Sequence, residues 1–169
     1  MRFLYAGRLS AVKNVGPMIE AVKSYDRTCS FTILGDGEER GKMEKLADGN
    51  KRIRFIGAVK PDEVQRAMKE ADVLIMNSTF EGIPMTILEA ISQGLPVITT
   101  DVGGIKEVLT YGKDSEVTDG SVERIHTAMD KILLDYEAYA KAAYDKSLQF
   151  DYRKVNRKVF DVLNESLHW

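Results

Sequence analysis

Short apolar runs alternate with amphipathic stretches over roughly the first 110 residues of the chain. The runs are continuous and rich in β-branched and aromatic residues, as is typical of parallel strands that are covered on both faces. We predict strands over 2–7, 29–35, 53–57, 72–78 and 96–101, and helices over 14–25, 38–48, 61–70, 84–93 and 104–111. This alternation indicates βαβ units, and so a Rossmann-like, doubly wound parallel sheet of the α/β class.

The pattern changes after residue 112. The segment "SEVTD" at 115–119 predicts a short sixth strand, and three successive helices are expected over 121–134, 136–149 and 152–167. We therefore expect a helical C-terminal tail over about 121–167. The last of these helices would pack on its own domain or on a neighbour that the chain lacks. Because no repeat, low-complexity segment or Pro/Gly-rich linker interrupts the chain, we predict a single domain over residues 1–169.

Charge and composition narrow the possible functions. The chain of 169 residues has a formal charge of −2, which gives no basic footprint for nucleic acid. Its apolar runs are far shorter than the about 20 residues of a membrane span, and no signal peptide opens the chain, so we expect a cytoplasmic protein. Cys29 is the only cysteine, and His126 and His168 lie far apart in the sequence. We therefore expect no disulfide, no bound metal and no cofactor.

The stretch "STFEGIPMTILEAISQG" at 78–94 leads into a helix that has no obvious capping side chain. Gly82 and Ile83 carry no side-chain oxygen, and Pro84 suits the first helical turn. The amides expected to lack a partner are those of Met85, Thr86 and, less clearly, Ile87. Such a helix start is a site for an anion, most simply a phosphate, although water could satisfy the same amides.

Two glutamates flank this helix start. Glu89 lies about five residues into the helix, so roughly 7 Å from its beginning at 1.5 Å per residue. That is about the distance from the terminal phosphate of a nucleoside diphosphate to its ribose, whose vicinal hydroxyls suit a carboxylate. Glu81 lies on the other side, where a hydroxylated group attached to the phosphate would project. The alternative is that both are solvated surface acids.

Two cations follow the first predicted strand, in "GRLSAVKN". Arg8 offers a planar fork and Lys13 a flexible point charge, so both could neutralise phosphate oxygens beside the two glutamates. The motif "GDG" at 35–37 and the glycine pair Gly103 and Gly104 are weaker signals. Each could mark a close approach of the backbone to a ligand or merely a turn.

The segments "GRLSAVKN", "GDG" and "FEGIPMTILEAISQGLPVITTDVGGIKEV", in this order, resemble the C-terminal half of a GT-B fold retaining glycosyltransferase of family 4, formerly group 1. The resemblance covers roughly residues 2 to 110. It implies that Arg8 and Lys13 bind the donor phosphates, that Glu89 binds the ribose, and that Glu81 contacts the transferred sugar. The implied donor-binding set is Gly7, Arg8, Lys13, Gly35, Val59, Glu81, Gly82, Ile83, Pro84, Met85, Thr86 and Glu89, with Glu81, Arg8 and Lys13 as the catalytic candidates.

The resemblance also implies an activity. The family transfers a sugar, such as a hexose, from a nucleotide donor (UDP-, GDP- or ADP-sugar) to an acceptor, without a metal, in polysaccharide or glycoconjugate synthesis. The reaction takes place between two domains, and this chain starts at the first strand of the second. We therefore expect the N-terminal, acceptor-binding domain to be absent and the isolated chain to be inactive. That domain, in cis or as a partner chain, could also provide peripheral contact with a membrane.

Two other functions are compatible with the same residues. The chain could be a non-catalytic partner subunit that binds a nucleotide sugar, or a fragment of a GT-B fold nucleotide-sugar epimerase. A Rossmann dehydrogenase is disfavoured, because no G-x-G-x-x-G follows the first strand, which ends in "AGRLSAVK".

Overall fold

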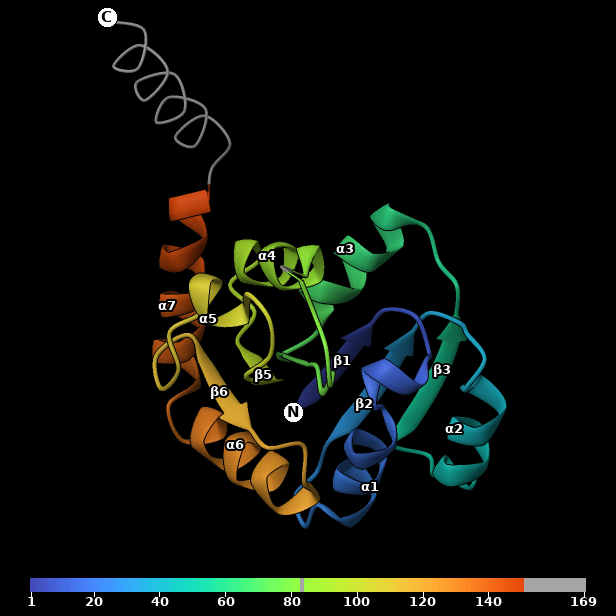
Figure 1. Ribbon diagram of the computed structural model, residues 1–169. Helices are drawn as coiled ribbons and strands as arrows, with labels where there is room; N and C mark the ends of the chain where they lie inside the picture. Colours follow the sequence, from blue (N-terminus) through green and yellow to red (C-terminus); the bar gives the residue numbers. More distant parts are fainter. Residues whose placement is uncertain (83, 151–169) are drawn as a thin grey trace, which may run out of the picture.

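The computed structural model describes residues 1–82 and 84–150, which form one parallel sheet between two layers of helices (Figure 1). The strands of the sheet are β1 (Arg2–Ala6), β2 (Ser30–Leu34), β3 (Ile53–Gly57), β4 (Val73–Ile75), β5 (Val97–Thr100) and β6 (Ser115–Thr118). They lie in the order β3-β2-β1-β4-β5-β6, and every neighbouring pair is parallel. The predicted Rossmann-like, doubly wound fold is therefore confirmed.

The helices cover both faces of the sheet (Figure 1). They are α1 (Gly16–Ser24), α2 (Arg40–Ala47), α3 (Pro61–Glu70), α4 (Met85–Ser92), α5 (Ile105–Val108), α6 (Val122–Leu134) and α7 (Tyr136–Ser147), with short 3-10 helices η1 (Ala11–Lys13) and η2 (Leu148–Phe150). Helices α1, α2 and α6 pack on one face, against side chains such as Phe3 and Tyr5. Helices α3, α4, α5 and α7 pack on the other face, against Leu4 and Ala6. The strands are buried on both sides, which explains their continuous apolar sequence.

Several boundaries differ from the prediction. The helix expected from residue 14 begins at Gly16, because η1 precedes it and Asn14 adopts a left-handed conformation with φ of 46°. The strand expected over 72–78 is shorter, since β4 ends at Ile75. The helix expected over 104–111 is only the single turn of α5. The sixth strand is confirmed as β6, while the helix expected over 152–167 lies outside the described residues.

The order of the strands defines where a crevice forms. From β1 the chain passes to β2 on one side, whereas β4 lies on the other side of β1 and continues to β5. In such sheets, ligands bind outside the carboxyl ends of the strands, at the point where the connections turn to opposite sides. Here that point lies between β1 and β4, so the loops that follow these two strands are the candidates for a site.

No helix among residues 1–82 and 84–150 combines the length and the apolar character that crossing a membrane requires.

Candidate functional site

The loops after β1 and β4 meet in an ion pair between Lys13 and Glu81. Lys13 is the last residue of η1, and its Nζ lies 2.5 Å from Oε1 of Glu81. The two loops are also joined through Val12, whose carbonyl accepts hydrogen bonds from the amide and the hydroxyl of Thr79 at 2.8 and 3.3 Å. The structure thus brings together two of the predicted catalytic candidates at the crevice.

Glu81 is a buried carboxylate, with only 9% of its surface exposed. Its Oε1 accepts a second hydrogen bond, at 2.6 Å, from the hydroxyl of Ser78. A buried carboxylate requires such donors, because removing it from water without them is costly. The alternative that both glutamates are solvated surface acids is therefore wrong for Glu81.

The glycine pair after β5 supports the Glu81 loop. Gly103 has a φ of 58°, and a Cβ placed on it would lie only 1.8 Å from the carbonyl oxygen of Glu81. The amide of Gly104 donates to the carbonyl of Gly82 at 3.2 Å. The sequence left two roles open for this pair, a close approach to a ligand or a turn. These contacts are with the backbone of the protein itself, so neither role describes them fully. The pair packs its backbone against the backbone of the loop that carries Glu81.

The start of α4 lacks a capping side chain, as predicted. Pro84 is the N-cap residue, with an extended backbone, and does not lie in the first helical turn as we expected. The amide of Ile87 donates to the carbonyl of Pro84 at 3.0 Å, so the expectation that it is unpaired is wrong. The amides of Met85 and Thr86 have no partner among the residues that the structure describes. Ile83 lies outside those residues.

A cavity of about 340 Å³ opens at the same edge of the sheet, and five of the twelve residues of the predicted donor-binding set line it, while Arg8, Lys13 and Glu81 do not. Its lining consists of Ala6, Gly7, Leu34, Gly35, Ala58, Val59, Pro61, Val64, Thr86 and Glu89. The Glu89 side chain is half-buried, and no described residue forms a hydrogen bond or ion pair with its carboxylate. The cavity therefore combines an apolar wall with an available carboxylate and the uncapped start of α4.

Gly7 and Gly35 allow the ends of β1 and β2 to approach each other at the floor of this cavity. Gly35 has a φ of 127°, and a Cβ on it would lie 1.9 Å from the carbonyl oxygen of Gly7. A side chain at residue 35 would therefore collide with the neighbouring backbone. Gly35 of the "GDG" motif thus lets two strand ends approach each other. Its only relation to a ligand site in the described structure is its position in the cavity wall.

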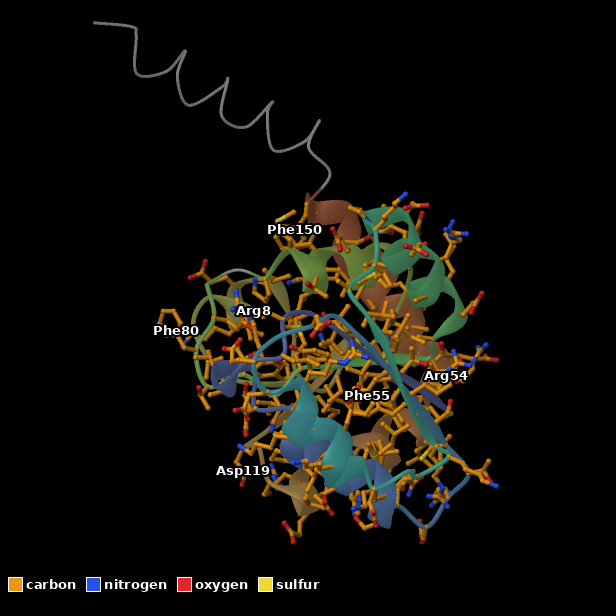
Figure 2. All side chains as sticks on the ribbon, turned by 90° about the vertical axis from the view of Figure 1, so that its right-hand side faces the viewer. Arg8, Arg54, Phe55, Phe80, Asp119 and Phe150 are labelled. Atoms are coloured by element: carbon orange, nitrogen blue, oxygen red, sulfur yellow. The ribbon has the colours of Figure 1, made fainter. Side chains whose placement is uncertain are left out.

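Arg8, another predicted site residue, does not line this cavity. It is 73% exposed and forms an ion pair with Glu38 at 3.2 Å. Its backbone is held in place, because the hydroxyl of Tyr5 donates to its carbonyl at 2.7 Å. Burial, with a smaller effect from the charge of Glu81, raises the pKa of Tyr5 above its usual value, so this hydroxyl keeps its proton. Figure 2 labels Arg8 and also Phe80, whose ring is 74% exposed.

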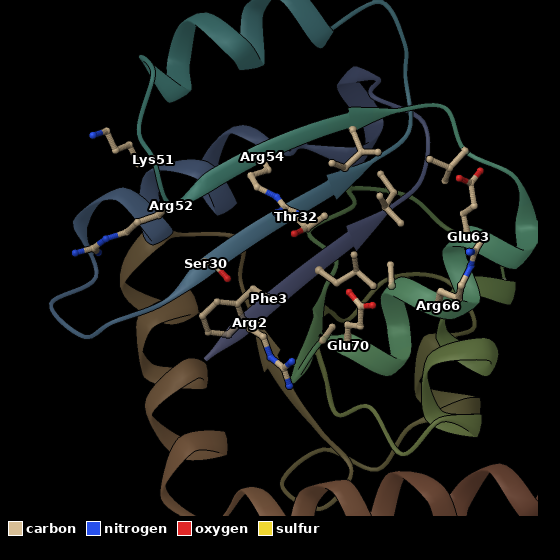
Figure 3. A pocket seen from close by; sticks show the side chains of 16 residues that line it. Arg2, Phe3, Ser30, Thr32, Lys51, Arg52, Arg54, Glu63, Arg66 and Glu70 are labelled. Atoms are coloured by element: carbon tan, nitrogen blue, oxygen red, sulfur yellow. The ribbon is translucent and has the colours of Figure 1, made fainter.

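A larger cavity, of about 480 Å³, lies on the face of the sheet beside α3 (Figure 3). Its arginines are largely paired: Arg2 contacts Asp72 at 2.6 Å, and Arg66 contacts Asp62 at 3.1 Å. Of the predicted site residues, only Val59 contributes to its lining. We therefore place the candidate site in the smaller cavity, where unpartnered groups converge.

Sequence reasoning missed three residues that shape the site. Ser78 and Asn77 follow β4 and are fully buried, and Glu38 pairs with Arg8. Ser78 was present in the quoted stretch, three residues before Glu81, but its contact depends on the conformation of the loop. Metal binding was not expected, and among the described residues no group of three or more His, Cys, Asp or Glu side chains is placed to hold an ion.

Curated glycosyltransferases are similar to this chain in sequence. The sulfoquinovosyl transferase SQD2 of Arabidopsis thaliana is 28% identical over 163 residues, which are 92% of this chain and 32% of that protein. The lipopolysaccharide core biosynthesis glycosyltransferase LpsE of Rhizobium meliloti is 32% identical over 133 residues, which are 76% of this chain and 38% of that protein. The chain therefore spans between a third and two-fifths of these relatives.

Solved structures give the same fold. The apo form of the lipopolysaccharide outer core galactosyltransferase WaaB superimposes with a TM-score of 0.84 at 23% identity, covering 98% of this chain and 49% of that one. Anabaena Alr3699/HepE in complex with UDP-glucose has a TM-score of 0.83 at 21% identity, covering 97% and 48%. The sheet described above is thus one half of a GT-B fold. Since residues 2–147 match the family described as glycosyl transferases group 1, this chain belongs to the group 1 glycosyltransferases.

Proposed function

We propose that this chain binds the nucleoside-diphosphate sugar donor of a retaining, metal-independent glycosyltransferase. The observation that carries the proposal is the convergence of the 340 Å³ cavity, the available carboxylate of Glu89 and the uncapped start of α4 at one edge of the sheet. The solved structure of Anabaena Alr3699/HepE in complex with UDP-glucose supports the same class of ligand.

Each part of the donor has a matching group in this arrangement. The diphosphate would lie at the start of α4, where the amides of Met85 and Thr86 and the positive end of the helix dipole favour an anion. The ribose hydroxyls would bind Glu89, and the base would contact the apolar wall that includes Val59. The transferred sugar would then reach Glu81, a buried acceptor of hydrogen bonds.

The cations account for the chemistry of the leaving group. In the proposed reaction, the bond between the anomeric carbon and the phosphate oxygen breaks, and the oxygen of an acceptor hydroxyl bonds to that carbon on the same face. The proton of that hydroxyl passes to the leaving phosphate, which keeps the atoms and charges balanced. Arg8 and Lys13 would stabilise the negative charge that develops on the diphosphate. Arg8 must leave Glu38 to do so.

We further propose that the acceptor site belongs to a second domain, either N-terminal in cis or on a partner chain. The exposed apolar side chains of Phe80 and Met85, on either side of the Glu81 loop, support this division because a covering domain would remove them from water. The relatives that this chain matches are also two to three times longer than it is. The isolated chain would then bind the donor and transfer little sugar.

Calorimetric titration of the chain with UDP, GDP and ADP tests the donor site. We expect one diphosphate to bind, and Glu89→Ala and Arg8→Ala each to weaken it by roughly 1–3 kcal/mol, the range for losing a hydrogen bond to a charged group. Glu137→Ala, at an exposed glutamate of α7, is the control and should leave the affinity unchanged.

Two results would contradict the proposal. A folded chain that binds none of the three diphosphates has no donor site of its own. Efficient transfer by the purified chain to a defined acceptor would show that no second domain is needed for the reaction.

A further inference from the structure

We infer that Ser78 is a positioning residue that orients the carboxylate of Glu81 toward the transferred sugar. The inference rests on the proposed function and extends it to the residue that determines how strongly the sugar part of the donor is held. It begins from the two oxygens of Glu81, which have different surroundings.

One oxygen of Glu81 is already saturated by the protein. Oε1 accepts a hydrogen bond from the hydroxyl of Ser78 at 2.6 Å and another from Nζ of Lys13 at 2.5 Å. No described residue donates to Oε2. A carboxylate has lone pairs on both oxygens, so Oε2 is the atom that can accept a hydrogen bond from a ligand hydroxyl.

Ser78 itself is held rigidly. It is fully buried, and its carbonyl accepts a hydrogen bond at 2.6 Å from the hydroxyl of Thr100, the last residue of β5. The preceding residue, Asn77, donates its side-chain amide to the carbonyls of Asn14 and Gly120 at 3.3 and 3.2 Å. The Ser78 hydroxyl is therefore a fixed point, whereas Lys13 reaches Glu81 on a long and flexible side chain.

These contacts determine which way the carboxylate faces. The terminal torsion of a glutamate is broad, so a carboxylate with one flexible donor can rotate. The Ser78 hydroxyl fixes Oε1, and this leaves Oε2 as the oxygen for a ligand hydroxyl. Without the hydroxyl, the same carboxylate would still be present and charged, but its available oxygen would no longer have one direction.

The consequence is selective for one part of the ligand. A nucleoside diphosphate has no sugar beyond its phosphates, so it would not contact Oε2 in the proposed arrangement. A nucleotide sugar would contact Oε2 through a hydroxyl of its sugar. Loss of the Ser78 hydroxyl should therefore weaken the nucleotide sugar and leave the diphosphate alone, which a general structural defect would not do.

The test compares UDP with UDP-glucose, GDP with GDP-mannose, and ADP with ADP-glucose by calorimetry on the wild-type chain, and then uses the pair that binds. We expect Ser78→Ala to weaken the nucleotide sugar roughly fivefold, the effect of one hydrogen bond, and to change the diphosphate less than twofold. Glu81→Gln releases Lys13 from its ion pair and so can change the affinity for both ligands, but it should still lower the affinity for the nucleotide sugar relative to that for the diphosphate. Ser92→Ala removes a hydroxyl that bonds only to the Glu89 carbonyl of its own helix and should change neither affinity.

The outcomes separate this inference from the proposed function. Equal weakening of both ligands by Ser78→Ala, or no weakening of the nucleotide sugar, overturns the inference and leaves the donor site intact. A wild-type chain that binds no member of any pair overturns the proposed function and the inference with it. Urea unfolding without nucleotide gives a further test on Ser78→Ala, Glu81→Gln and the double variant. The double variant must lose less free energy of unfolding than the sum of the two single losses, and strictly additive losses also overturn the inference.

Discussion

Lys13 and Glu81 lie 68 positions apart in the sequence, yet the Nζ of one contacts Oε1 of the other at 2.5 Å. The contact joins the loop after β1 to the loop after β4, across the point where the sheet connections diverge. In the absence of a ligand, Lys13 thus neutralises a buried carboxylate. In the proposed site, the same two groups would engage the phosphate and the sugar of the donor.

Lys13→Ala should lower the free energy of unfolding by roughly 1–3 kcal/mol, because it leaves the buried Glu81 carboxylate without its cation. Glu81→Gln should destabilise less, and the double variant should lose less than the sum of the two. Urea unfolding at pH 7 measures all three. Lys42→Ala breaks an exposed pair with Glu39 and should leave the free energy of unfolding almost unchanged. Strictly additive losses for Lys13→Ala and Glu81→Gln would contradict the prediction.

Gly103→Ala should disturb the Glu81 loop as well as the local backbone. The added Cβ meets the Glu81 carbonyl at 1.8 Å, and the residue has positive φ. Gly112→Ala is a matched control, since Gly112 also has positive φ, 78°, but nothing lies within 4 Å of its added Cβ. We expect Gly112→Ala to lower the free energy of unfolding by roughly 1–2 kcal/mol from backbone strain alone. Urea unfolding should give a larger loss of the free energy of unfolding for Gly103→Ala than for Gly112→Ala, and calorimetry should give a weaker donor affinity for Gly103→Ala. Equal losses in the two variants would show that the close approach is unimportant.

Glu38→Gln should strengthen nucleotide binding severalfold at low salt. Arg8 is paired with Glu38, and in the proposed site a diphosphate would compete for it. A hydrogen bond from its own backbone amide, and then Arg8, hold the pKa of Glu38 below its usual range, so the competing charge is present at pH 7. Calorimetry at low salt and near 1 M salt should show the gain only at low salt. Glu44→Gln, which removes one of the two carboxylates that pair with Arg40, should leave nucleotide binding unchanged.

Acid should remove the contribution of the pair between Arg2 and Asp72, which links β1 to the start of β4. Burial raises the pKa of Asp72, but the hydrogen bonds and the charge of Arg2 outweigh it, so the pKa lies below its usual value. A depressed carboxyl pKa stabilises the folded state above the unfolded value of about 4, and this stability is lost as pH falls through the folded value. Asp72→Asn should therefore destabilise at pH 7, and the difference from wild type should narrow toward pH 3 in urea unfolding. Asp62→Asn, in an exposed pair with Arg66, should show little difference at either pH.

The pattern of apolar positions predicted the existence and type of each strand and α-helix through β6, although not the 3-10 helix η1, because a doubly covered parallel strand and an amphipathic helix differ in period. It predicted their ends less well. The turn at Asn14, which separates η1 from α1, depends on a left-handed residue and on contacts from Asn77. The N-cap position of Pro84 depends on how its loop meets Gly103 and Gly104. Such contacts come from distant segments and have no local signature.

For the site, the spacing of Glu81 and Glu89 around an uncapped helix start predicted a ligand with a phosphate and hydroxyl groups, and that ligand stays a prediction. Helix geometry and backbone hydrogen bonding are local, so the sequence by itself determined these features and the fold that carries them. The tertiary structure alone decided that Lys13 and Ser78 share one oxygen of Glu81, that Arg8 contacts Glu38, and that the Glu89 carboxylate has no partner among residues 1–82 and 84–150. The reason is that each of these depends on side-chain positions set by packing between strands and loops, which one segment of sequence does not encode.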